Sequence, residues 1–172
     1  MPILIEEITR RYNRKIFDCG VDELNRFLQQ QARQKTAKHI SKTYVACQDS
    51  TSSIVLGYYT LTGYSVAIPP AHRDYKKYPH PLSAVKLARL AVDRAHQGQR
   101  VGERLLVDAI RKTVRVAQHM AVIGLFVDPT HLDIVPFYRQ YGFLAADPED
   151  HSRLEMWLPI NSCEKVVKSW IN

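Results

Sequence analysis

Apolar residues recur along the chain with the two periods that predict strands and helices. Residues 2–8, 43–47, 53–68, 84–92, 121–127 and 153–158 are rich in apolar, β-branched or aromatic side chains, which favours strands. Apolar residues at helical spacing predict a helix after Val21, a second after Gly102 and a short third over 134–141. This order of strands and helices predicts one α/β or α+β domain over residues 1–172.

Local signals set the expected ends of these elements. Asp22 is a candidate N-cap for the first helix, and Gly142 follows the third helix where a C-terminal glycine is common. The polar run at 49–52 predicts the turn of a hairpin. The proline-rich segment 69–81 is expected to be an exposed loop.

The excess of basic residues favours a polyanionic partner. Lys and Arg total 24 against 17 Asp and Glu, a net charge of +7, which favours nucleic acid or an acidic protein as partner. Cys19, Cys47 and Cys163 are too widely spaced to indicate a zinc site or a disulfide framework. No apolar run is long enough to cross a bilayer, so we expect a soluble protein with reduced thiols in the cytoplasm.

The segment 87–102 carries the strongest chemical signal. An apolar strand, Leu87-Ala-Arg-Leu-Ala-Val-Asp93, runs into the loop Gln97-Gly-Gln-Arg-Val-Gly102 and then into an amphipathic helix. A helix that begins directly after a loop offers unpaired N–H groups and the positive end of its dipole to a pyrophosphate. The chain has no G-x-x-x-x-G-K-[ST] and no G-x-G-x-x-G after a strand, so ATP and NAD are poor candidates.

Two motifs together resemble the GNAT family of acetyl-CoA-dependent N-acetyltransferases. They are Gln97-x-x-Arg100-x-Gly102 and, about forty residues later, Phe137-Tyr-Arg-Gln-Tyr-Gly-Phe143. With Phe17-Asp-Cys-Gly20, Thr43-Tyr-Val-Ala and Gly57-Tyr-Tyr-Thr-Leu, nearly the whole chain is similar to the GNAT toxins of bacterial type II toxin–antitoxin modules.

The resemblance implies a fold, a reaction and partners. The fold is a central mixed, mostly antiparallel sheet flanked by helices and splayed between its fourth and fifth strands. The expected protein is a homodimeric toxin that transfers acetyl from acetyl-CoA to the α-amino group of aminoacyl-tRNA and so blocks translation. A ribbon-helix-helix antitoxin would neutralise it, and neither a metal nor a membrane is implied.

The resemblance also assigns the donor site. Backbone groups of Leu90, Ala91 and Val92 would pair with the pantetheine arm as an added strand. The pyrophosphate loop comprises Gln97, Gly98, Gln99, Arg100, Val101 and Gly102, while Arg104 either adds a contact or is a solvated helix residue. Arg100 stands where the family has a glycine, which puts the loop geometry in question, although a guanidinium also pairs with phosphate.

Tyr138 maps to the family's general acid, the tyrosine that protonates the departing CoA thiolate. A phenol of pKa about 10 keeps its proton at neutral pH and can donate it to a thiolate. Tyr141 fits a packing role better. An α-amine titrates near about 8, so a general base is dispensable; His96, His131 and Asp128 are weak candidates for one.

Three basic clusters support an RNA substrate if they share one face. They lie at 10–15, 33–42 and 73–77. Two alternatives remain: a GNAT enzyme for a protein or small-molecule amine, and a CoA-binding interaction module without catalysis.

Overall fold

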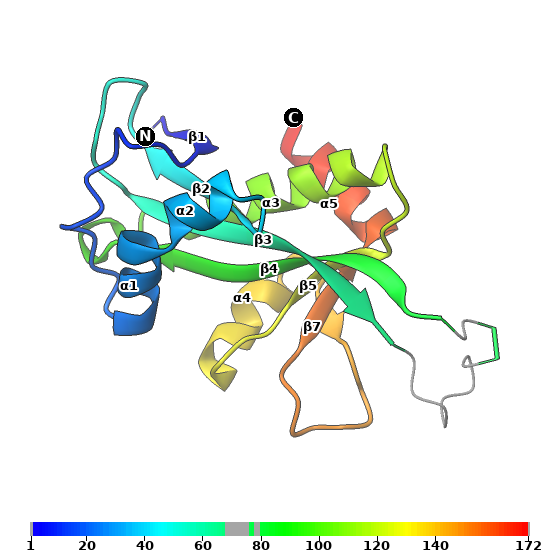
Figure 1. Cartoon of the computed structure of the whole chain (residues 1–172). Coiled ribbons are helices and arrows are strands. Elements are labelled where there is room, and N and C mark those ends of the chain that lie inside the picture. The colour runs from blue at the N-terminus through cyan, green and yellow to red at the C-terminus, as the bar shows by residue number, and fades with distance from the viewer. Residues whose placement is uncertain (1, 68–75, 78–79, 172) are drawn as a thin grey trace. The chain divides into compact units, whose positions relative to one another are not determined.

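The computed structural model describes residues 2–67, 76–77 and 80–171. Within these residues seven strands form one sheet in the order β1-β2-β3-β4-β5-β7-β6. The strands are β1 (Leu4–Glu7), β2 (Lys42–Cys47), β3 (Gly57–Val66), β4 (Leu82–Val92), β5 (Gly124–Val127), β6 (Leu144–Ala145) and β7 (Met156–Pro159). The helices are α1 (Asp22–Gln30), α2 (Ala32–Ala37), α3 (Val101–Ala117), α4 (Val135–Arg139) and α5 (Ile160–Ile171), with short 3-10 turns η1 (Arg94–His96) and η2 (Leu132–Ile134) (Figure 1).

The sheet is mixed and mostly antiparallel, as expected. β1 pairs with β2, β2 with β3, β5 with β7, and β6 with β7, all antiparallel. β4 and β5 are parallel neighbours, because α3 connects them across the sheet. The mixed, helix-flanked sheet that the resemblance implied is confirmed.

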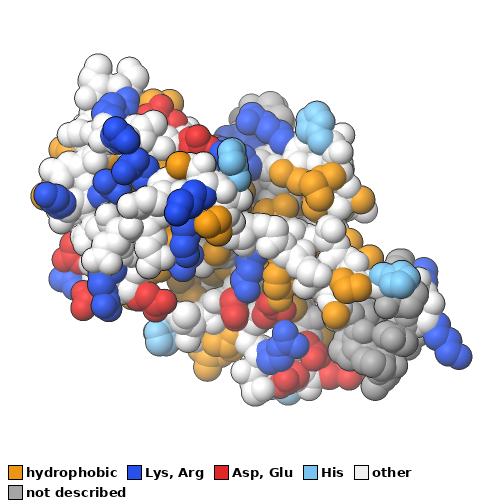
Figure 2. All heavy atoms as spheres, in the orientation of Figure 1, with side chains coloured by type: hydrophobic (Ala, Val, Ile, Leu, Met, Phe, Trp, Pro, Cys, Tyr) orange, Lys and Arg blue, Asp and Glu red, His pale blue; other side chains and the backbone are white. Residues whose placement is uncertain are grey.

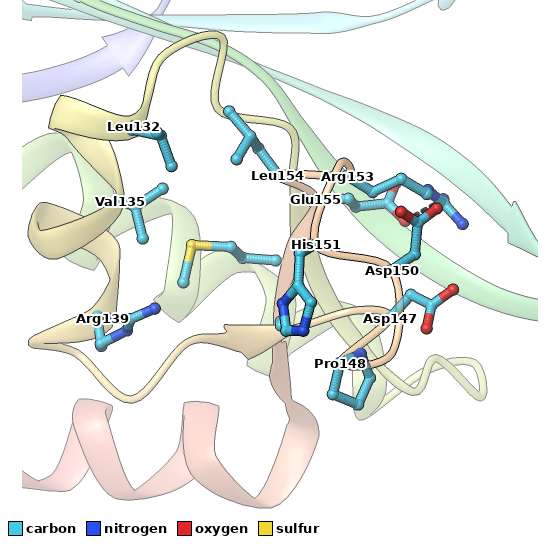
Figure 3. Close-up of a pocket in the computed structure, with 12 residues that line it drawn as sticks. Leu132, Val135, Arg139, Asp147, Pro148, Asp150, His151, Arg153, Leu154 and Glu155 are labelled. Atoms are coloured by element: carbon cyan, nitrogen blue, oxygen red, sulfur yellow. Dashed lines mark hydrogen bonds and ion pairs between the residues drawn. The ribbon is translucent and has the colours of Figure 1, made fainter.

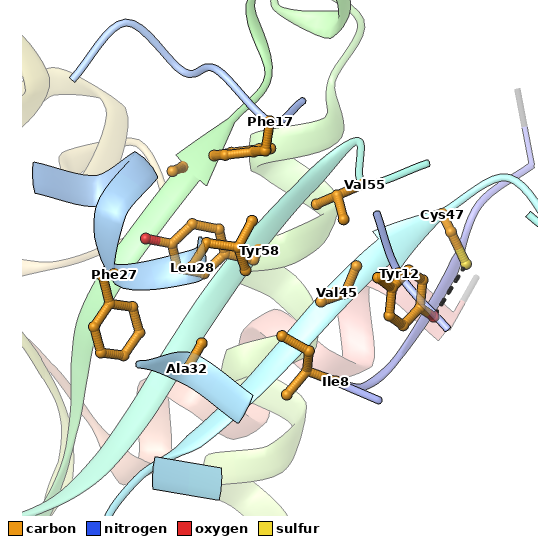
Figure 4. Close-up of a cluster of buried hydrophobic side chains, with 11 residues drawn as sticks. Ile8, Tyr12, Phe17, Phe27, Leu28, Ala32, Val45, Cys47, Val55 and Tyr58 are labelled. Carbon is orange, nitrogen blue, oxygen red and sulfur yellow. Dashed lines mark hydrogen bonds between the residues drawn. The ribbon is translucent and has the colours of Figure 1, made fainter. Parts of the chain in front are cut away.

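The chain divides into two compact units, and β3, β4 and α3 contribute residues to both. Unit 1 contains Met1–Thr62 and Leu87–Ala109. Its core forms where Phe27 and Leu28 of α1 and Ala32 of α2 pack on Val45 and Tyr58 of the sheet (Figure 4). These apolar residues lie on one face of each helix, so burying that face fixes α1 and α2 on the strands.

Unit 2 contains Gly63–Lys86 and Ile110–Asn172. Phe126 of β5 stacks on Trp157 of β7 at 5.4 Å between ring centres, and Tyr64 of β3 lies 5.3 Å from Phe126. Gly124 is essential to the β5–β7 pair, since a Cβ there would lie 2.3 Å from the carbonyl oxygen of Leu158. Unit 2 thus combines a cluster of three aromatic rings with a closely paired β5 and β7.

Several expected details were wrong. Asp22 is the first residue of α1, and Val21 is the N-cap, with no side-chain capping bond. The helices α2 and α5 and the two-residue strand β6 were not predicted from the sequence. Most of the expected loop 69–81 lies outside the described residues.

Within the described residues no helix is both long enough and apolar enough to cross a membrane.

Candidate active site

β4 carries the three residues assigned to the pantetheine arm. Ala91 is buried, and Leu90 and Val92 are half-buried. Gly57 of β3 lies against this segment so closely that a Cβ would be 2.7 Å from the Ala91 carbonyl oxygen and 2.9 Å from Leu105. A glycine at 57 therefore lets β3, β4 and the start of α3 come together.

The loop between β4 and α3 has the backbone of an anion cradle. Gly98 and Arg100 have φ of 78° and 64°, and α3 begins at Val101. A Cβ at Gly98 would meet no heavy atom within 4 Å, so the surface above this glycine is open. Residues 97–100 are exposed, and the first turn of α3 presents N–H groups without helical partners, as an anion requires.

Arg100 adopts the left-handed conformation that glycine favours, so the arginine preserves the loop geometry. Such a conformation costs a non-glycine residue about 1–2 kcal/mol. The Arg100 side chain is 84% exposed, and its Nε lies 3.9 Å from Glu103. The side chain is thus largely solvated, beside the exposed backbone of the loop.

Gln97 directs its side chain into the protein. Its Nε2 donates to the carbonyl oxygens of Val92, at 2.9 Å, and Cys19, at 3.2 Å. The loop residues 97–102 therefore contribute backbone and, at Arg100, a cation, whereas the Gln97 side chain holds the loop in place. Arg104 lies half-buried on α3.

Tyr138 lies in unit 2, on α4. Its side chain is 4% exposed and packs edge-on against Phe137 at 5.1 Å and Phe143 at 5.5 Å. Burial raises the pKa of the Tyr138 phenol well above its usual value. Tyr141 is half-buried and packs edge-on against Phe137 at 5.7 Å. Gly142, with φ of 97°, turns the chain after α4.

The candidate bases differ in their surroundings. His131 and Asp128 are exposed after β5. His96 is half-buried in η1, where its Nδ1 lies 3.6 Å from Asp93. In the described part of the chain no three His, Cys, Asp or Glu side chains form a group that could hold a metal ion.

Unit 2 also contains a cavity of about 190 Å³ that sequence reasoning missed (Figure 3). Val135 and Arg139 of α4 line one side and the segment 147–156 the other. Glu155, at its wall, accepts hydrogen bonds from Tyr64 Oη at 2.6 Å and Arg153 Nη2 at 3.2 Å. No sequence signal marks this cavity, because an irregular segment between β6 and β7 forms it.

Unit 1 presents a surface of cations around α1 and α2, which we call the α1–α2 cation surface. Lys and Arg side chains gather over these helices in Figure 2. The surface comprises Arg26, Arg33, Lys35, Lys38 and Arg89, and none of these forms an ion pair with a carboxylate among the described residues. Of the three basic clusters in the sequence, the middle one contributes most to it.

Comparisons with known proteins identify the family of the chain. Residues 39–144 match the acetyltransferase (GNAT) domain model. The tRNA-acetylating toxin of Mycobacterium tuberculosis is 33% identical over 128 residues, which are 74% of this chain and 75% of that protein.

Two solved structures resemble the chain over almost its full length. A tyrosine-to-phenylalanine mutant of the toxin AtaT, bound to the C-terminus of the antitoxin AtaR and acetyl-CoA, superposes with a TM-score of 0.81 at 28% identity, covering 95% of this chain and 97% of that one. AtaT complexed with acetyl-methionyl-tRNAfMet gives 0.83 at 30% identity, covering 96% and 99%. The chain therefore belongs to the GNAT family of acetyltransferases.

Proposed function

We propose that this chain is a toxin that transfers acetyl from acetyl-CoA to the α-amino group of aminoacyl-tRNA. The observation that carries the proposal is the loop 97–102, which keeps a phosphate-cradling backbone even with Arg100 in place of glycine. The tRNA-acetylating relative and the tRNA-bound AtaT structure support a charged tRNA as the substrate that carries the acceptor amine.

The donor binds along β4 and the following loop in this proposal. Backbone groups of Leu90, Ala91 and Val92 pair with the amides of the pantetheine arm, as a strand pairs at a sheet edge. The N–H groups of residues 98–102 and the N-terminus of α3 hold the pyrophosphate. Arg100 adds an exposed cation, and Arg104, half-buried on α3, adds a second one.

The reaction itself needs little from the protein beyond orientation and one proton. The neutral α-amine attacks the acetyl carbonyl carbon, the carbon–sulfur bond breaks, and the amine loses a proton to solvent. We assign Tyr138 as the acid that protonates the departing thiolate. Because burial raises its pKa, the phenol keeps its proton near neutral pH, where part of the α-amine is already neutral.

The acceptor RNA binds, in this proposal, to the α1–α2 cation surface. Cations without carboxylate partners are free to pair with phosphates and release counterions. The net charge of +7 adds long-range attraction for a polyanion.

We further propose that the toxin acts in the cytoplasm as a homodimer of single-domain chains and is restrained by a ribbon-helix-helix antitoxin. The AtaT complex with the C-terminus of AtaR supports such a partner. Light scattering of the purified chain tests the dimer. Co-expression with ribbon-helix-helix proteins tests the antitoxin, since the cognate one should restore the growth that the toxin alone stops.

Transfer of labelled acetyl from acetyl-CoA to a pool of charged tRNAs tests the function. Uncharged tRNA and a lysine peptide are the controls. Label on charged tRNA alone supports the toxin. Label on the peptide favours a protein acetyltransferase, and acetyl-CoA binding without any transfer favours a binding module.

A further inference from the structure

A set of hydrogen bonds connects the segment leading into the pyrophosphate loop with the start of α1. Neither the motif at 97–102 nor the motif at 137–143 explains these bonds. We call this set the carboxylate junction, and it comprises Asp18, Asn25, Asp93, Arg94 and Gln97. We propose that Asp93 is a positioning residue that fixes the pyrophosphate loop by joining it to residues 18–20. The inference rests on the proposed function, since it assumes that CoA binds this loop.

Asp93 uses both carboxylate oxygens and its own N–H. Oδ1 accepts from the backbone N of Asp18 at 3.0 Å, and Oδ2 accepts from the backbone N of Ala95 at 3.1 Å. The N–H of Asp93 donates to the carbonyl of Leu56 at 2.9 Å. One side chain thus caps η1, the turn that leads into the loop, and holds a segment 75 residues away in sequence.

The other side of the junction is equally specific. The carbonyl of Asp18 accepts from the N–H of Arg94 at 2.8 Å, and Asp18 Oδ1 accepts from Gly20 N at 2.9 Å and Asn25 Nδ2 at 3.0 Å. Gly20 has φ of 91°, and a Cβ there would lie 3.1 Å from Nε of Arg94. The positive φ favours glycine at this position, while the exposed Arg94 side chain could shift to admit a Cβ.

Gln97, the first residue of the loop, adds a second set of ties. Its amide bridges the carbonyls of Cys19 and Val92, so the segment 93–97 that leads into the loop is fixed before any ligand arrives. A preformed loop spares the cofactor the entropy cost of ordering it. Asparagine at 93 would keep one acceptor and aim an NH₂ group at a backbone N–H, so one tie is lost without removing the side chain.

Calorimetric titration of the full chain with CoA and with pantetheine, which lacks the pyrophosphate, tests the inference. For Asp93→Asn we expect the Kd for CoA to rise about tenfold, the loss of one charge-assisted bond, while the Kd for pantetheine stays within about twofold. In the transfer assay, KM for acetyl-CoA should rise and kcat hold, because Asp93 touches no reacting atom.

Two further variants make the result decisive. Asp49→Asn is the matched control, since Asp49 Oδ1 accepts from the backbone N of Thr51 and Ser52 in a turn of the same kind; it should leave both Kd values unchanged. Gln97→Met removes the hydrogen bonds to Cys19 and Val92 and should repeat the selective loss of CoA affinity, with the melting temperature of the variant measured beside it.

Two outcomes would overturn the positioning role alone. One is a wild-type chain that binds CoA and an equally stable Asp93→Asn chain that binds it as well. The other is a loss of pantetheine affinity that equals the loss of CoA affinity. A wild-type chain that binds neither molecule overturns the proposed function itself, and the inference with it.

Discussion

The guanidinium carbon of Arg89 lies 3.7 Å from the centre of the Phe27 ring. Phe27 is 2% exposed, and Nζ of Lys35 lies 5.6 Å from the same ring centre. A buried aromatic ring therefore holds the planar guanidinium in a fixed position, and a cation so held loses little entropy on pairing with phosphate.

We predict that Arg89→Gln weakens binding of charged tRNA about tenfold and lowers the slope of log K against log salt by about 1, as expected for one lost phosphate contact. Arg89→Lys keeps the charge but not the planar stack on Phe27, so its affinity for tRNA should lie between those of the wild type and Arg89→Gln. Filter binding at several salt concentrations measures both quantities. Lys168→Gln, at an exposed position on α5, is the control; an unchanged slope in Arg89→Gln would remove Arg89 from the RNA surface.

Tyr138→Phe should reduce acetyl transfer by about two orders of magnitude or more, the usual contribution of a positioned acid. The affinity for CoA and the melting temperature should stay close to wild type, since the ring packing against Phe137 and Phe143 is kept. Tyr141→Phe is the matched control on the next turn of the chain and should retain transfer. Single-turnover transfer measures the effect, and a fully active Tyr138→Phe chain would reject the assigned acid.

Stability should fall in alkaline solution. Burial raises the pKa of Tyr58 and Tyr138, and a hydrogen bond to Glu155 raises that of Tyr64 to about 12. A raised folded-state pKa contributes stability that is fully present below the unfolded value of about 10 and is lost as the pH rises through the folded value. Urea unfolding from about pH 8 to 11 measures this, and Tyr138→Phe should flatten the decline above about pH 10. An identical decline in both chains would count against the raised pKa of Tyr138.

Arg100→Gly should leave the unfolding free energy within about 1 kcal/mol of wild type, because relief of the left-handed conformation offsets the greater freedom of unfolded glycine. Arg100→Val places a β-branched residue at the same φ and should cost about 1–3 kcal/mol. Chemical denaturation of the three chains measures the difference. Equal stability of the valine and glycine variants would show that the loop does not hold position 100 in this conformation.

Gly57→Ala should destabilise the chain by about 1–3 kcal/mol and weaken CoA binding, because the new methyl group pushes on the Ala91 carbonyl 2.7 Å away. Gly63→Ala on the same strand is the control, since nothing lies within 4 Å of its Cβ position. Thermal unfolding and CoA titration measure the two effects. If both alanine variants behave alike, the close approach of β3 and β4 is not rigid.

The sequence predicted those parts of the molecule whose signals are local. The apolar run 121–127 contains β5, Gly124–Val127, because burial follows side-chain type directly. Gly142 was expected to stop the third helix, but α4 ends earlier, at Arg139 with Gln140 as its C-cap, and Gly142 with its positive φ turns the chain after it. The helix α5 was not predicted because it begins directly after Pro159 of β7. No loop and no N-cap residue separates the strand from the helix, so the sequence gives no start signal.

The candidate site was predictable to the same extent. The motif predicted the loop 97–102. It did not predict the hydrogen bond between Asp93 and Asp18, because the two residues are 75 positions apart and no sequence pattern distinguishes either one. The orientation of the Gln97 side chain could not be predicted either, because its hydrogen-bond acceptor, the carbonyl of Cys19, comes close only in the folded chain.

Asn25 of the carboxylate junction stands two residues before Phe27 on α1, so a single short helix joins the cofactor loop to the surface that carries Arg89. Thermodynamic linkage makes such a connection reciprocal. Whatever factor bound acetyl-CoA adds to RNA affinity through this helix, RNA must add to acetyl-CoA affinity. The order in which the two substrates arrive would not change their combined free energy of binding.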